Sequence, residues 1–239
     1  MAASLHPDLM PSLRDLVRGL TLIFWVMPLA LLACVQGAVT DWLRPFGPFP
    51  PVITTGLLLL ALHFISRFQP QERVWQHTLD RAKILAIVNI GFVPFLYWFR
   101  RVPDEPTFYW AVALLSIFGL VFLCNLNLVL QRLVAMLPDE ILRSDVRFLT
   151  RLNLGLTIFV MIALGVYYVS AQLAENRPSP NIFIAVAQAF TEARRWMLLL
   201  LVLLPVAVTM SLLWKTKETV MKSVFSQPAP APVETPSNY

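Results

Sequence analysis

Six long windows of the chain contain no Asp, Glu, Lys or Arg and are largely apolar. They cover residues 19–40, 45–66, 84–99, 106–131, 152–174 and 196–214. A helix needs about 20 apolar residues to cross a hydrocarbon core of about 30 Å. Five windows reach that length, whereas 84–99 extends only about 24 Å at 1.5 Å per residue. Lys83 and Arg100 at its ends have long stems that reach the headgroups. The pattern therefore predicts six transmembrane helices.

From these windows we predict an all-α integral membrane protein, with amphipathic cytoplasmic loop helices and a disordered Pro-rich C-terminal tail. The predicted parts are a cytoplasmic N-terminal segment (1–18), the six-helix bundle (19–226) and the tail (227–239). The predicted spans are about 19–40, 51–67, 83–99, 107–130, 152–172 and 195–214. Composition agrees, because 57% of residues are hydrophobic and 14% are charged, against about 45–50% and about 25% in soluble domains.

The basic residues predict the orientation, because Lys and Arg are retained on the cytoplasmic side. With the N-terminus inside, the inner segments carry 13 of the 19 Lys and Arg residues, including all four lysines. Trp and Tyr, which prefer membrane interfaces, gather at the predicted outer ends. We expect a multi-pass protein of the cell (plasma or inner) membrane with both termini in the cytoplasm.

Polar residues within the spans form the first candidate site. The predicted membrane cores contain none of the 14 acidic residues, which argues against a proton-coupled carrier. The candidate polar cluster, placed in the cytoplasmic half of the second to fifth helices, consists of His63, Asn89, Asn125, Asn127 and Asn153. These side chains either join helices by hydrogen bonds or line a polar pocket open to the cytoplasmic leaflet. Pro28, Pro94 and Pro205 lie deep in predicted helices and would kink them around such a pocket.

The stretch Leu31-Leu32-Ala33-Cys34 has two interpretations. It resembles the cleavage box of a bacterial lipoprotein signal, in which Cys34 would become a lipidated N-terminus. The apolar run continues to Thr40, however, which favours a retained first helix. In that case the small residues form a helix-packing ridge, namely Ala30, Ala33, Cys34, Gly37 and Ala38.

Two loops on the predicted cytoplasmic side begin with Pro-x-Glu and then become amphipathic, at 70–83 and 138–153. Each segment either lies on the inner headgroup layer or extends the following helix into the cytoplasm. The second segment carries Arg143, Arg147 and Arg151 one helical turn apart. This cationic ladder is either a solvated face or a contact for anionic headgroups or an acidic partner. The similarity of the two hairpins is either an internal repeat or a chance match of a short pattern.

Motifs for catalysis and cofactor binding are missing from the sequence. It has no phosphate-binding loop, dinucleotide fingerprint, zinc-protease motif or nucleophile elbow. We predict no catalytic residues, no metal and no cofactor; His63 would ligate haem only with a histidine from a partner chain. Expected partners are membrane lipids, with anionic headgroups on the cytoplasmic side, and a membrane protein or a second copy, but no nucleic acid.

The function expected from these features is that of a non-catalytic accessory or scaffold subunit in a larger membrane assembly. The alternative is a carrier of lipid or small solutes that uses the candidate polar cluster. A membrane-embedded enzyme is the third possibility, although no nucleophile–base pair is visible in the sequence.

Reporter fusions test the predicted topology. Fusions after residues 75, 145 and 225 should report cytoplasm, and fusions after 45, 103 and 180 should report the outside, because the basic loops stay inside. A cytoplasmic signal from the fusion after residue 103 would contradict the assignment of the third span.

Overall fold

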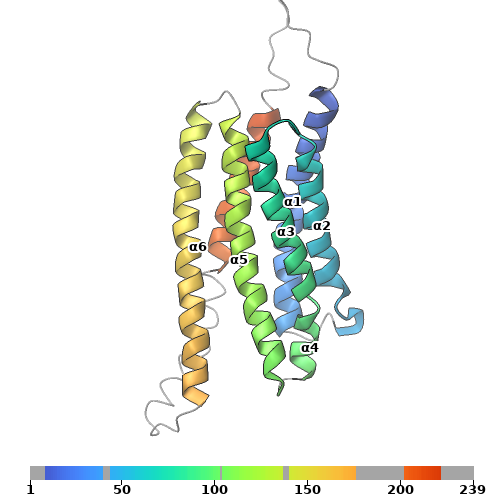
Figure 1. Ribbon diagram of the computed structural model, residues 1–239, viewed down its shortest axis with the longest axis vertical. Coiled ribbons are helices and arrows are strands. Elements are labelled where there is room, and N and C mark those ends of the chain that lie inside the picture. Colours follow the sequence, from blue (N-terminus) through green and yellow to red (C-terminus); the bar gives the residue numbers. More distant parts are fainter. Residues whose placement is uncertain (1–8, 40–43, 103, 137–139, 176–201, 222–239) are drawn as a thin grey trace, which may run out of the picture.

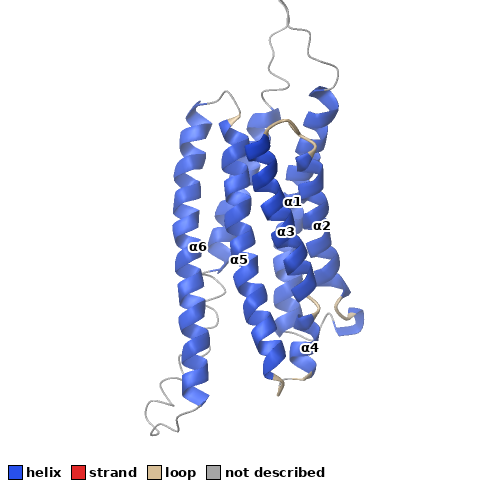
Figure 2. Cartoon of the chain, viewed as in Figure 1, coloured by secondary structure: helices blue, strands red, loops and turns tan. Residues whose placement is uncertain are grey.

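Long helices lie side by side along one axis in the computed structural model, which describes residues 9–39, 44–102, 104–136, 140–175 and 202–221 (Figure 1). The described residues contain no β-strand (Figure 2). The helices are α1 (Leu9–Val39), α2 (Phe49–Ser66), α3 (Arg73–Phe92), α4 (Phe95–Arg101), α5 (Pro106–Ala135) and α6 (Glu140–Glu175), with a short 3-10 helix η1 (Arg44–Phe46) before α2. Residues 202–221 are also helical and are called the C-terminal helix below.

Five segments in the described ranges are long and apolar enough to cross a membrane. These segments are Pro11–Ala38, Phe49–Ser66, Arg73–Arg101, Pro106–Ala135 and Arg143–Val166. The predicted all-helical fold is thereby confirmed, with five helices in these ranges that could cross a membrane by their length and composition. The sixth predicted span lies partly outside the described residues. The predicted tail 227–239 lies wholly outside them.

The third span differs from its prediction as a short helix. It runs over 29 residues, Arg73–Arg101, and is divided into α3 and α4 at Pro94. Pro94 has no N–H to donate to the carbonyl four residues earlier, and the chain next forms tighter bonds, from Leu96 N to Val93 O at 3.1 Å and Tyr97 N to Pro94 O at 3.1 Å. The added length at its start carries Arg73, Asp80, Arg81 and Lys83, so the uncharged part of the segment is still 84–99, with Lys83 and Arg100 at its ends.

Both amphipathic loop segments extend the helices that follow them. Residues from Arg73 onward belong to α3, and residues from Glu140 onward belong to α6. The α3 extension is held by Trp75, whose side chain is fully buried and whose Nε1 donates to Phe68 O at 3.0 Å. Gln76 Nε2 donates to Ser66 O at 3.0 Å. These bonds fasten the start of α3 to the end of α2.

At Gly19, α1 and α2 approach each other closely. A Cβ atom on Gly19 would lie 2.5 Å from Ile65 Cγ1 and 2.9 Å from Ala61 O. Ala61 and Ile65 are themselves buried. Only glycine therefore fits at this position without separating the two helices. At the same end, Arg67 of α2 pairs with Asp15 of α1 at 3.3 Å.

The C-terminal helix joins the main core. Its Leu212, Leu213 and Val220 are buried in the same cluster as side chains from α1, α2, α3 and α5. The Trp214 ring lies 5.5 Å from the Phe24 ring of α1. The helix therefore connects the α5–α6 side of the bundle with α1.

Substitution of Gly19 tests the α1–α2 contact. Gly19→Val should lower the apparent melting temperature in detergent by about 5 °C or more, because the new side chain would collide with the α2 backbone. Gly37→Val is the matched control, since an added Cβ at Gly37 has nothing within 4 Å. Equal melting temperatures for the two variants would contradict the close contact.

Candidate functional site

The described structure brings together Asn127 of α5, Asn153 of α6 and Thr209 of the C-terminal helix. Asn127 Nδ2 donates to Thr209 Oγ1 at 3.0 Å, and Asn153 Nδ2 donates to the same oxygen at 2.8 Å. The three side chains are 2%, 0% and 0% exposed. We call them the amide cluster. The cluster joins three helices through one hydroxyl group.

Every donor of the amide cluster is used. Asn127 Nδ2 also donates to Leu123 O at 2.8 Å, and Asn153 Nδ2 also donates to Pro205 O at 3.2 Å. Thr209 Oγ1 accepts two bonds and donates one to Pro205 O at 2.8 Å, which is the full capacity of a hydroxyl. The Oδ1 atoms of Asn127 and Asn153 are buried and have no partner among the described residues. The cluster therefore has two spare acceptors and no spare donor.

The amide cluster lies toward the end of the bundle where α1, α3 and α6 begin (Figure 1), with Asn153 about 20 Å from the start of α6 at Glu140. Arg132 follows Asn127 by five residues, and Lys215 follows Thr209 by six. These two cations therefore lie about 7.5 Å and about 9 Å closer to that end than the amide cluster does. Arg151 precedes Asn153 by two residues, which places it only about 3 Å from the level of the cluster. The Asp145–Lys215 ion pair, at 3.6 Å, links α6 to the C-terminal helix above the cluster.

Asn89 lies apart from the amide cluster. Its Nδ2 donates to Leu85 O at 2.9 Å and to Phe118 O of α5 at 3.4 Å. Phe118 precedes Asn127 by nine residues, about 13 Å along α5, so Asn89 lies near the middle of the bundle. Its Oδ1 has no partner in the described part of the chain and lies 4.0 Å from the position of a Cβ on Gly119. Asn89 is a separate link between α3 and α5.

The other two members of the candidate polar cluster do not reach the amide cluster. His63 is exposed in the last turn of α2. Asn125 is half-buried, and its Nδ2 donates to Val121 O within α5 at 3.3 Å. Since Asn125 and Asn127 are two positions apart on a helix, they point to different sides of it.

The three arginines of the cationic ladder have different surroundings. Arg143 Nη2 donates to Ala135 O at 3.1 Å and so caps the last turn of α5. Arg147 and Arg151 are exposed on α6. The ladder is thus divided between one arginine directed at α5 and two on the outer face of α6.

The helix-packing ridge of α1 contacts two neighbouring clusters. Ala30 belongs to the main core and Ala33 is buried. Cys34 and Ala38 pack against the smaller cluster of Val93, Leu96 and Leu115 at the other end. Gly37 is half-buried with open space beside it.

Thr209 and Gly19 were not identified from the sequence as contact residues. Thr209 follows Pro205 by four residues, so both lie on one helix face, and that spacing is the signal that could have identified it. Gly19 is the first residue of the first apolar window. Its importance depends on which helix packs against it, and the sequence does not show that.

The described residues contain no group of three or more His, Cys, Asp or Glu side chains that could hold a metal ion. The amide cluster itself can accept hydrogen bonds or join helices. Its one hydroxyl, Thr209 Oγ1, donates to a backbone carbonyl and not to a general base.

Removal of the Thr209 hydroxyl tests the amide cluster. Thr209→Val keeps the shape but leaves two amide donors without an acceptor, so it should destabilise the bundle by about 2 kcal/mol. Thr216→Val is the control on the same helix, because Thr216 is buried and its Oγ1 donates only locally, to Leu212 O at 2.8 Å. Unfolding in mixed micelles measures both. If Thr209→Val costs no more than Thr216→Val, the hydroxyl does not hold the three helices together.

The chain was compared with models of protein families, with curated proteins and with solved structures, and none of these comparisons found a match. No activity therefore passes to the chain from a relative. The features of the chain that bear on its function are the amide cluster, the exposed helix faces and the placement of the charges.

Proposed function

We propose that the chain is a non-catalytic multi-pass protein of the cell membrane that acts as an accessory or scaffold subunit of a larger membrane assembly. It crosses the membrane six times, and both termini lie in the cytoplasm. The observation that carries this proposal is the outer face of α6, which combines an exposed apolar stripe, a glycine and an exposed arginine.

The stripe occupies one side of α6, the helix at the edge of the bundle beside α5 (Figure 1). Its members are separated alternately by four and three residues, as in a seam that receives another helix. They are Phe148, Leu152, Gly155, Phe159, Ile162 and Val166, all exposed. The five apolar side chains could be covered by lipid alone and do not by themselves indicate a protein neighbour. Two further features favour one.

Gly155 is the first of these features. An added Cβ at Gly155 has nothing within 4 Å among the described atoms. A glycine in a helix interior costs about 0.5–1 kcal/mol relative to alanine and gives no benefit against lipid. In membranes, small residues allow the backbone of a second helix to approach closely. Gly155 therefore favours a helix packed on the stripe.

Arg151 is the second feature. It is exposed beside the stripe and lies about 4–6 Å deeper than Arg132 and Lys215, by the rise per residue from the amide cluster. It lies directly before the predicted span 152–172, where its charge either reaches the headgroups or pairs with a group on a neighbouring helix. An acidic side chain on a neighbouring helix would compensate its charge.

The amide cluster supports a structural role for the core. All four Nδ2 hydrogens of Asn127 and Asn153 are used in bonds within or between helices. Such bonds join helices and leave no donor for a solute.

One observation favours the second candidate, a carrier of lipid or small solutes. The Oδ1 atoms of Asn127 and Asn153 are buried without a described partner, and each could accept a hydrogen bond from a solute. Purification from native membrane in a mild detergent distinguishes the two functions. Stoichiometric partner chains support the scaffold, and a co-purified solute that Thr209→Val releases supports the carrier.

The stripe on α6 is tested by photo-crosslinking and substitution. A photoreactive residue at position 162 should crosslink to another membrane chain, and Gly155→Leu should reduce recovery of that chain at least tenfold, because the larger side chain prevents close approach. Recovery is measured after purification in the same mild detergent.

Gly91→Leu on α3 is the matched control. Gly91 is also exposed, with nothing within 4 Å of an added Cβ, but no arginine lies beside it. Recovery of the partner should be unchanged in this variant. Crosslinks from position 162 to lipid only, with recovery equal in both glycine variants, would show that α6 faces the bilayer.

A further inference from the structure

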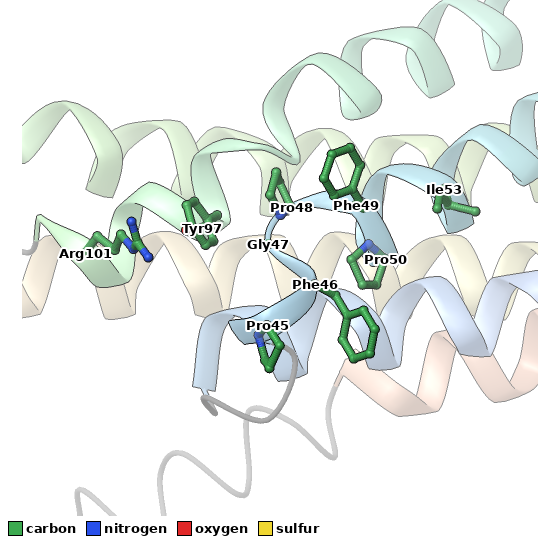
Figure 3. A pocket seen from close by; sticks show the side chains of 9 residues that line it. All are labelled: Pro45, Phe46, Gly47, Pro48, Phe49, Pro50, Ile53, Tyr97 and Arg101. Atoms are coloured by element: carbon green, nitrogen blue, oxygen red, sulfur yellow. The ribbon is translucent and has the colours of Figure 1, made fainter.

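A groove of about 670 Å³ lies at the opposite end of the bundle from the amide cluster, between the start of α2 and α4. Figure 3 shows the side chains that line it, with Tyr97 and Arg101 on one wall. The lining residues are Pro45, Phe46, Gly47, Pro48, Phe49, Pro50, Ile53, Tyr97 and Arg101. They come from η1, the η1–α2 connection, α2 and α4, so segments about 50 residues apart in sequence form one groove.

The connection between η1 and α2 forms the rim of the groove, and its prolines make it rigid. Pro45, Pro48 and Pro50 each have a fixed φ angle. Gly47 has φ +60°, a left-handed conformation that glycine adopts at no steric cost. The chain therefore holds the shape of this wall before any ligand binds, which lowers the entropic cost of binding.

An apolar track leads from the rim along α2. Phe46, Phe49 and Ile53 are 63%, 68% and 59% exposed, and the last two are one helical turn apart. Since α2 continues as a candidate membrane span to Ser66, the track runs toward the hydrocarbon. Its shape and polarity suit an acyl chain.

The other wall carries a cation. Arg101 is the last residue of α4, and its Cζ lies 4.7 Å from the centre of the Tyr97 ring. At this distance the ring face attracts the guanidinium, and an arginine in such a contact can use its N–H groups to bind the oxygens of a phosphate. Exposed Trp98 and Trp110 lie on the neighbouring turns of α4 and α5, and Trp is typical of the headgroup level.

We propose that this groove binds one phospholipid, with its phosphate on Arg101 and an acyl chain along Phe49 and Ile53. The charge on one wall and the apolar track on the other match the two ends of such a molecule. A free phosphate ion would use the cation and leave the track uncovered. The site is independent of the α6 stripe.

Native mass spectrometry of the full chain released from nanodiscs of phosphatidylglycerol and phosphatidylcholine tests the proposal. The unmodified protein should retain one phospholipid through detergent washing. Arg101→Gln should reduce retention about fivefold to tenfold, because one charge-assisted contact is lost. Ile53→Ser should also reduce it, because the acyl chain loses contact area.

Arg100→Gln is the matched control, one residue away on α4 and outside the groove lining. It should retain lipid like the unmodified protein. Retention of both lipids that depends on Arg101 and Ile53 supports a phospholipid site. Equal retention in all variants, replacement of the lipid by a nonionic detergent, or no retained lipid at all would overturn it.

Discussion

A hydrocarbon environment supplies no hydrogen-bond partners, so each amide in the bundle core has to find its partners within the protein. Thr209 meets this requirement for two helices at once, since its hydroxyl accepts from both Asn127 and Asn153. The position of α6 depends on these bonds and on the Asp145–Lys215 pair. Because α6 packs in this way, its opposite face is directed outward, and the proposed partner interface follows from the same bonds.

The two ends of the bundle have different chemistry. One end carries the amide cluster, the ion pairs of Asp15 and Asp145, and the extension of α3 held by Trp75. The other has proline-rich turns, neighbouring aromatic rings and the groove beside Arg101. Polar bonds fix the helices at the first end, whereas apolar contact and rigid turns shape the second. Ligand or partner contacts at either end therefore depend on different forces.

The membrane class and most helix positions could be predicted from the sequence. Burying a charge in lipid is costly, so a span appears in the sequence as an uncharged window with charged residues on either side. The continuity of 70–83 with α3 was left open, because amphipathic periodicity is the same for a surface helix and for a helix extension. Asn127 and Asn153 were identified as candidates, but spacing alone cannot show that they meet through Thr209. That contact depends on which faces pack together, and for the same reason His63 and Asn89 lie elsewhere.

The position of Thr209 in the chain also bears on biogenesis. Thr209 follows Asn127 by 82 residues and Asn153 by 56, so α5 and α6 are synthesised well before their shared acceptor. Until the C-terminal helix is in place, neither amide has the acceptor that it uses in the finished bundle. The helix of residues 202–221 thus completes the hydrogen bonding of two helices made before it, so this part of the bundle can be completed only after α5 and α6 have been synthesised.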